Sequence, residues 1–332
     1  MHMADALLSP AVGGAMTAVS VAAIGYAVKK ISRDGLDEKK IPLMGVMGAF
    51  VFAGQMINFT IPGTGSSGHI GGGILLAALL GPFPALIALA SVLLIQCLLF
   101  ADGGLLAYGC NVFNMGVCSC LLAYRYVYKP IAGKGFSAKS IFWASVMSVI
   151  LGLQVGAFGV VAETYLSGVT ELPFRAFLLL MQPIHLAIGL VEGLVTAAVL
   201  TFVYNARPEL LTSTVQETAL AKNISTRKVA AALLVSTALV GGGLSLFASA
   251  YPDGLEWSME GVAGTAELER DDPVHKTMSG VVEATAVMPD YSFAGSEEGS
   301  SLGTATAGIA GSVVTLMLAG GLGLAVGAAR RK

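Results

Sequence analysis

The sequence predicts an all-α fold, a polytopic transmembrane helix bundle with about nine membrane helices. Hydrophobic residues make up 55% of the chain and charged residues only 12%, which is far from the composition of soluble globular proteins. Apolar runs long enough to cross about 30 Å of hydrocarbon recur along the chain. Basic residues cluster between these runs in a pattern that obeys the positive-inside rule when nine runs are counted.

Nine apolar runs, taken in order, are the expected helices. Pro10 is well placed to begin the first. The third run is too short to cross upright and ends at Gly81-Pro82, where proline removes a backbone donor, so we expect a short helix inside the bundle. The runs cover residues 11–28, 41–59, 70–80, 82–100, 105–126, 140–162, 174–203, 229–250 and 304–329.

Charge predicts the orientation. With nine spans, four groups of Lys and Arg fall on one side, and the positive-inside rule makes that side the cytoplasm. We therefore expect an extracytoplasmic N-terminus and a cytoplasmic C-terminus. The charges follow the first run instead of preceding it, which argues against a cleaved signal peptide. The groups are Lys29, Lys30, Arg33, Lys39 and Lys40; Arg125, Lys129, Lys134 and Lys139; Arg207, Lys222, Arg227 and Lys228; and Arg330, Arg331 and Lys332.

A polar segment divides the chain into two modules. Residues 206–227 are rich in Ser and Thr, which predicts a cytoplasmic linker between residues 1–205 and residues 228–332. In the second module the outside loop 251–303 is strongly acidic. It either concentrates divalent cations by electrostatic attraction or is a solvated loop of partial order. Its histidine, His275, is as readily incidental as a transient ligand.

The cysteines predict no disulfide framework. All four lie in or beside expected spans, and none lies in the long outside loop where a disulfide would be expected. We interpret them as small buried residues. They are Cys97, Cys110, Cys118 and Cys120.

The first two residues form a potential chelate. The free amine of Met1, the backbone nitrogen of His2 and the His2 Nδ1 close a five-membered and a six-membered ring around one metal ion. Their three nitrogens lie near one plane, which suits Ni(II) or Cu(II), and Co(II) less well. Alone the signal is weak, because an N-terminal Met-His is usually only a retained initiator methionine followed by a histidine. Asp5 and Asp102 are outside acids that either attract a cation or are merely solvated.

A glycine-rich loop offers a further nitrogen donor. Residues 61–73 read Ile-Pro-Gly-Thr-Gly-Ser-Ser-Gly-His-Ile-Gly-Gly-Gly, and glycine permits close backbone approach and unusual dihedrals. The histidine, His69, is expected on the same side of the membrane as the N-terminus. A lone loop histidine is more often a polar surface residue. Together with His2, however, it completes a plane of four nitrogens.

Small residues at i, i+4 spacing form ridges on the first two helices. Such ridges let helix backbones approach closely within a bilayer. Spacing alone favours packing within the bundle, and the alternative is a docking face for another membrane subunit. The ridges are Gly14, Ala18 and Ala22, and Gly45, Ala49 and Ala53.

Several motifs in combination resemble one known family. They are similar to the nickel/cobalt substrate-capture subunit (NikM/CbiM family) of energy-coupling-factor (ECF) transporters, over residues 1 to about 205. The segment 251–256, Tyr-Pro-Asp-Gly-Leu-Glu, resembles the two-helix companion subunit (NikN/CbiN), here fused at the C-terminus. The motifs of the first module are Met1-His2 with Asp5 and Leu8-Ser9-Pro10, Gly68-His69-Ile70-Gly71-Gly72, Gly109-Cys110-Asn111-Val112-Phe113-Asn114-Met115-Gly116, and His185 with Glu192-Gly193.

The resemblance implies the ligands and the partners. The metal would be held by Met1, His2 and His69, with Ni²⁺ or Co²⁺ as the transported substrate and no organic cofactor. The partners would be an ECF transmembrane coupling protein and two ABC ATPase subunits in a prokaryotic cell membrane, and the Gly45 ridge becomes a docking candidate. Met3, Ala4 and Ala6 depart from the usual opening, Met-His-Ile-Pro-Asp/Glu-Gly, so metal preference is open.

Four polar residues within the spans have two interpretations. Asn111 and Asn114 either lock helices together or orient His2 and His69. His185 and Glu192 lie two turns apart on one face of the seventh run, where ionisable groups are costly unless paired or functional. The four nitrogens already fill a plane, so we expect them to support the site rather than bind the metal. Asp5 and Ser67 are supporting candidates of the same kind.

These patterns favour a non-catalytic transport subunit. No Gly-x-x-x-x-Gly-Lys-Ser/Thr loop occurs, so ATP hydrolysis must come from other chains, and no basic aromatic face for nucleic acid is present. Nickel is favoured over cobalt on planar geometry and on the fused arrangement. One alternative, a membrane-embedded metalloenzyme, would need an open metal position. The other, a passive channel, would not retain its ion.

Overall fold

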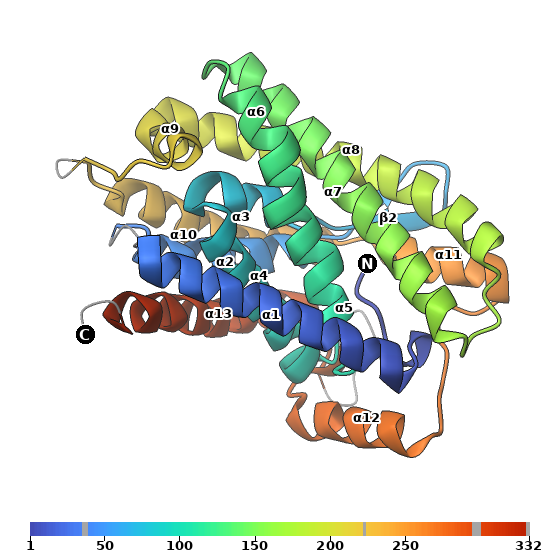
Figure 1. Ribbon diagram of the computed structural model, residues 1–332. Helices are drawn as coiled ribbons and strands as arrows, with labels where there is room; N and C mark the ends of the chain where they lie inside the picture. The colour runs from blue at the N-terminus through green and yellow to red at the C-terminus, as the bar shows by residue number, and fades with distance from the viewer. Residues whose placement is uncertain (35–38, 222–223, 294–299, 330–332) are drawn as a thin grey trace.

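The computed structural model describes residues 1–34, 39–221, 224–293 and 300–329. Helices dominate it (Figure 1). Of the basic residues that predicted the orientation, Lys222, Arg330, Arg331 and Lys332 lie outside the described residues.

The elements follow the expected runs closely. Up to Ala206 they are η1 (Asp5–Leu7), α1 (Pro10–Asp34), α2 (Ile41–Gln55), β1 (Phe59–Ile61), β2 (Ser66–Gly68), α3 (Gly73–Leu80), α4 (Pro82–Phe100), α5 (Tyr108–Asn111), the π-helical η2 (Val112–Tyr128), α6 (Lys129–Ala132), α7 (Ala138–Ser167) and α8 (Phe174–Ala206). Beyond it come α9 (Pro208–Gln216), α10 (Arg227–Gly242), η3 (Leu244–Phe247), α11 (Gly254–Ala263), α12 (Pro273–Thr285), η4 (Pro289–Tyr291) and α13 (Ser301–Ala329).

Six helical segments of the described chain are long and apolar enough to cross a membrane. They are α1, α4, α7, α8, α10 with η3, and α13. The expected run 41–59 is the shorter apolar helix α2 of 15 residues, and 70–80 is the 8-residue α3. The run 105–126 consists of α5 followed directly by η2.

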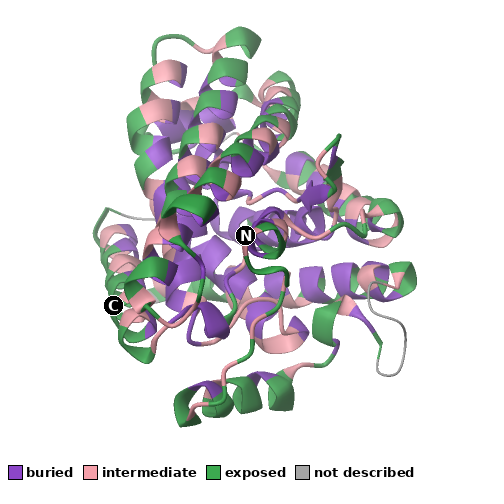
Figure 2. Ribbon diagram, turned by 90° about the vertical axis from the view of Figure 1, so that its right-hand side faces the viewer, coloured by how far each residue is buried: buried purple, intermediate pink, exposed green. Residues whose placement is uncertain are grey.

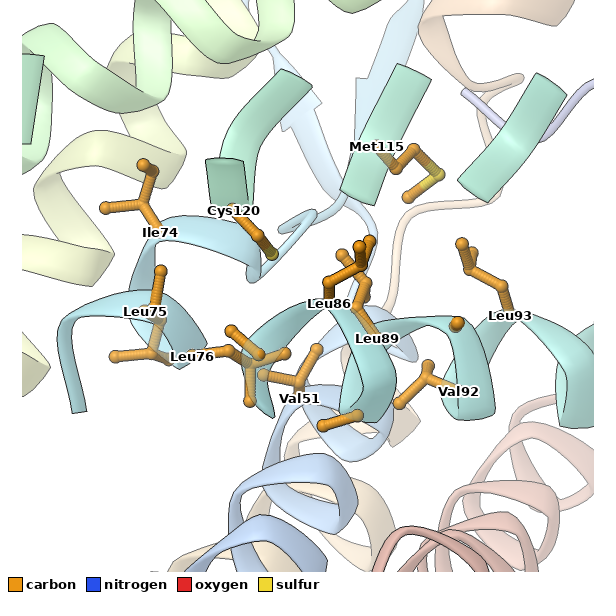
Figure 3. Packing of buried hydrophobic residues seen from close by; sticks show 14 of the residues in the cluster. Val51, Ile74, Leu75, Leu76, Leu86, Leu89, Val92, Leu93, Met115 and Cys120 are labelled. Carbon is orange, nitrogen blue, oxygen red and sulfur yellow. The ribbon is translucent and has the colours of Figure 1, made fainter. Parts of the chain in front are cut away.

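Helix α4 lies at the centre of the bundle. Its Leu86 and Leu89 are fully buried, and it packs against α2, α3, η2 and α13. Figure 3 shows Leu86 and Leu93 of α4 extending toward Met115 of η2, with Val51 of α2 close by. The apolar residues of α4 thus form the centre around which these helices pack.

Several helices carry large apolar side chains that are exposed, and Figure 2 shows exposed residues along the outward faces of the helices. On α8, Leu179, Leu186 and Leu190 are exposed, whereas His185 and Glu192 on the same helix are buried. A helix that borders lipid is expected to expose apolar side chains and to bury its ionisable side chains.

The ridge of Gly45, Ala49 and Ala53 is covered by the chain itself. A Cβ at Gly45 would lie 2.6 Å from the Leu316 carbonyl oxygen of α13, and Ser312 Oγ of α13 donates to the Ala49 carbonyl at 3.2 Å. The docking interpretation of this ridge is therefore wrong, because helices α10 and α13 occupy that face. The other ridge, Gly14, Ala18 and Ala22 on α1, is exposed.

Two segments expected as linker and loop contain packed helices. The segment 206–227 includes α9, whose Thr214 is buried and accepts a hydrogen bond from Lys40 Nζ at 2.7 Å. The described part of the acidic loop contains α11 and α12, which begin at the capping residues Asp253 and Asp272. The interpretation of this loop as partly ordered is wrong for its described residues, because side-chain caps satisfy the first backbone N–H groups of both helices.

Candidate metal-binding site

The N-terminal segment is inserted into the bundle and is held there by hydrogen bonds. Met3 is fully buried, and its backbone makes two hydrogen bonds to one side chain: the N–H donates to Asn111 Oδ1 at 2.7 Å, and the carbonyl accepts from Asn111 Nδ2 at 3.1 Å. The same carbonyl accepts from Gly104 N–H at 2.9 Å. Asn111 thus fixes the peptide immediately after His2.

Asp5 anchors the segment further along. Its Oδ1 accepts from Ala107 N–H at 2.9 Å, and burial raises the pKa of this carboxyl while the backbone donors act in the opposite direction. A side chain at Gly104 would collide with Asp5. Asp5 therefore holds the N-terminus to the loop before α5.

The two expected histidine ligands lie side by side. The rings of His2 and His69 are stacked, with centroids 5.2 Å apart and planes 13° from parallel. His69 follows β2 and its Nδ1 lies 3.1 Å from the Ile70 carbonyl. Because a carbonyl only accepts, Nδ1 carries the proton and Nε2 is the lone-pair donor. Burial lowers the pKa of His69 to about 4, with the positive N-terminus adding to the effect, so the ring is neutral and available for a metal.

Two carboxylates from distant parts of the chain face the chelate atoms. Asp253, the capping residue of α11, forms an ion pair with the Met1 amine, and Asp102 Oδ1 lies 3.2 Å from His2 Nδ1. Tyr291 donates its hydroxyl hydrogen to Asp102. Burial opposes ionisation of Asp253, but the adjacent ammonium and its hydrogen bonds hold its pKa well below the usual range. Burial also lowers the pKa of His2, which Asp102 partly offsets.

The segment before α11 is joined to the glycine loop by backbone bonds. Ser67 N–H donates to the Pro252 carbonyl at 2.8 Å, and Ser67 Oγ donates to the Tyr251 carbonyl at 2.7 Å. Ser67 therefore places Asp253 beside the amine and makes no described contact with His2 or His69.

His275 of α12 is also part of this assembly. It is 2% exposed, and its Nε2 lies 3.0 Å from both the Asp5 and the Leu8 carbonyl oxygens. Its Nδ1 lies 2.5 Å from Asp272 Oδ2. Both ring nitrogens of His275 are engaged in these contacts, so the residue fastens α12 to the N-terminal segment.

The remaining candidate residues, Asn114 and Glu192, make different contacts. Asn114 Nδ2 donates to Glu163 Oε2 at 2.7 Å and lies 3.8 Å from Met3 Sδ, so this residue links η2 to α7 and touches the N-terminal segment, and no described hydrogen bond joins it to His2 or His69. Glu192 Oε1 accepts from Gly72 N–H at 2.9 Å and supports the glycine loop. Gly72 has a φ of 76°, and a Cβ there would lie 2.5 Å from Val51, so only glycine fits.

Comparison with known proteins identifies the family. A family model described as the cobalt uptake substrate-specific transmembrane region matches residues 2–210. The chain belongs to this family. A second model, the PDGLE domain, matches residues 227–328, so the chain is a CbiM region followed by a PDGLE domain.

Relatives and a solved structure agree with this. A putative fused nickel transport protein NikMN of Archaeoglobus fulgidus is 33% identical over 96% of both chains. A cobalt transport protein CbiM of Sorangium cellulosum is 29% identical over 64% of this chain and 94% of its own length. A crystal structure described as a truncated transition metal transporter, 29% identical, covers 62% of this chain and 99% of that chain with a TM-score of 0.55. The chain is thus a membrane subunit of a metal transporter, and its relatives are transporters rather than enzymes.

Sequence reasoning did not find the contact of Asp253 with Met1. The residue was visible only as part of the Tyr-Pro-Asp-Gly-Leu-Glu motif. The signal that bears on it is the spacing of Asp253 and Glu256, which forms a capping box at the start of α11. That spacing predicts a helix start but not the partner 252 residues away.

Proposed function

We propose that this chain captures Ni(II) outside the cell as the substrate-specific subunit of an ECF-type ABC importer. The observations that carry the proposal are the neighbouring rings of His2 and His69 and the burial of Met1, which lines one cavity together with His69. Four nitrogens, three of them joined in two chelate rings, suit Ni(II). Co(II) is the alternative substrate, and it would use the same residues.

The proposed topology puts this point on the outside. It comprises about nine membrane helices, including the short α3, in a prokaryotic cell membrane with the N-terminus extracytoplasmic and the C-terminus cytoplasmic. The grouping of Lys and Arg between spans supports it. Residues 1–205 form the capture module, 206–227 a cytoplasmic connection, and 228–332 the companion module, whose loop covers the site.

The partners in this proposal supply the energy. A transmembrane coupling protein and two ABC ATPase subunits drive the transfer inward, since the sequence carries no ATP-binding loop of its own. The exposed ridge of Gly14, Ala18 and Ala22 supports docking on α1, because small residues allow a second helix to approach closely.

The test compares the purified chain bearing its native N-terminus with one carrying two extra residues, Gly-Pro, before Met1. The added residues displace the amine without altering any side chain, and the proline nitrogen has no proton to lose, so the new N-terminus cannot form a chelate of amine and amide nitrogens with His2. We expect the native chain to bind Ni(II) tightly. In the extended chain the affinity should fall by much more than the roughly 10–100-fold that is typical when a residue that hydrogen-bonds a metal ligand is mutated. Equal binding by both forms would place the site elsewhere, and tighter Co(II) than Ni(II) binding would assign the cobalt alternative.

A further inference from the structure

A small cavity lies on the inner side of the proposed chelate. Its volume is about 20 Å³, enough for one water-sized species, since about 10–15 Å³ is the minimum. Met1, His69 and Asp253 line one side of it, and His185 and Glu192 of α8 line the other. The cavity therefore connects the chelate to two ionisable residues that the proposed capture step does not use.

Glycines produce this space. The segment Gly68–Gly72 runs along α8: a Cβ at Gly68 would lie 2.6 Å from Ile188 Cγ1, and a Cβ at Gly71 would lie 3.5 Å from both carboxylate oxygens of Glu192. A Cβ at Gly254, next to Asp253, would lie 3.3 Å from His185 Nε2. Without side chains the loop approaches α8 while leaving the two polar groups accessible from the cavity.

His185 is oriented as a metal ligand would be. Its Nδ1 lies 2.8 Å from the Met181 carbonyl, so Nδ1 carries the proton and Nε2 presents a lone pair. Fixing the second ring nitrogen on a carbonyl is the usual support of a metal-bound histidine. The residue is 1% exposed, and no described residue donates a hydrogen bond to Nε2.

Glu192 is oriented in a similar way. Gly72 N–H holds Oε1, while Oε2 has no donor among the described residues, and the side chain is 2% exposed. Both free atoms are acceptors, and burying acceptors without donors or cations is costly. Seven residues separate His185 from Glu192, which places Glu192 about 10 Å further along α8.

We propose that this cavity is a second, inner binding station for the divalent transition-metal ion, with His185 Nε2 as its nitrogen ligand and Glu192 as its countercharge. The inference rests on the proposed function, because the chelate is the source of the ion. In this arrangement an ion that leaves Met1, His2 and His69 first contacts the imidazole of His185, which is already oriented. It then reaches the carboxylate of Glu192.

The experiment uses Co(II), whose visible d–d absorption reports its ligands, on the full-length chain with the extra N-terminal Gly-Pro. We expect one weak Co(II) site in this chain. His185→Ala should abolish its absorption, and Glu192→Gln, which keeps the acceptor for Gly72, should weaken it by about 10-fold. Thr196→Val is the matched control, since Thr196 is buried on α8 and does not line the cavity, and it should leave the spectrum unchanged.

The same variants with the native N-terminus separate the two proposals. Tight Ni(II) binding by His185→Ala with a native N-terminus shows that the chain folds and that the chelate is independent of the inner station. A Gly-Pro-extended chain without any Co(II) spectrum, or one whose spectrum survives His185→Ala, overturns the inner station alone. Equal tight binding by native and extended chains overturns the chelate instead.

Discussion

On the outer side of the site, the Met1 amine and His2 Nδ1 each face a carboxylate, Asp253 and Asp102. On the inner side, His185 Nε2 and Glu192 Oε2 face no donor in the described chain. The outer atoms carry protons that a metal must replace, and the neighbouring carboxylates stabilise them in the metal-free form. His185 Nε2 carries none, because the proton is on Nδ1. The difference predicts that metal capture on the outer side of the site releases protons, whereas binding to His185 Nε2 releases none.

The largest effect should come from pH. Binding displaces protons from the Met1 amine and the His2 amide, so the free chain holds more protons than the loaded one and affinity must fall in acid, by up to roughly 100-fold per pH unit. His69 adds little above about pH 5, because its pKa is held at about 4. Ni(II) titrations at several pH values between 5.5 and 7.5 measure the slope. Affinity that is flat across this range would contradict amide and amine coordination.

A smaller effect should follow from Asp253→Asn. Asn is as good a helix cap as Asp, so α11 should stay folded while the negative charge beside the amine is lost. We expect Ni(II) affinity to fall by about 10-fold, the usual size for a residue that contacts a metal ligand, because the loss of a countercharge to the divalent cation outweighs the loss of the ion pair with the singly charged amine in the metal-free form. Glu256→Gln is the control: Glu256 accepts from the Asp253 N–H at 2.9 Å but does not contact Met1. A rise in affinity in Asp253→Asn would show that the carboxylate competes with the metal.

The contrast between the outer and inner sides of the site also shows which features can be predicted from the sequence. The boundaries of α4, Pro82 and Phe100, coincide with those of the apolar run, because hydrophobicity and a proline are local properties. The chelate of Met1 and His2 is equally local. Asp253 and His275 could not be assigned to the site, because their partners lie more than 250 residues away in the chain.

Asn111 and Asn114 show a second limit. Both are amides three residues apart at the start of one helical stretch, yet Asn111 bonds the Met3 backbone, whereas Asn114 bonds Glu163 and touches only the Met3 sulfur. The helix changes there from α5 to the π-helical η2. A π-helix repeats at a different angle from an α-helix, so the faces of its residues cannot be read from a 3.6-residue period.

The smallest effect should distinguish these two asparagines. Asn111→Leu removes both hydrogen bonds to the Met3 backbone and loosens the peptide that carries the chelate, so Ni(II) affinity should fall by several-fold to about 10-fold. Asn114→Leu is its matched control, since the same change in volume removes the bond to Glu163 in α7 and a 3.8 Å contact with Met3 Sδ but leaves both bonds to the Met3 backbone in place. It should reduce thermal stability in detergent but leave the affinity within about twofold. Equal affinity losses in both variants would mean that η2 supports the site as a whole and that Asn111 has no specific hold on the N-terminus.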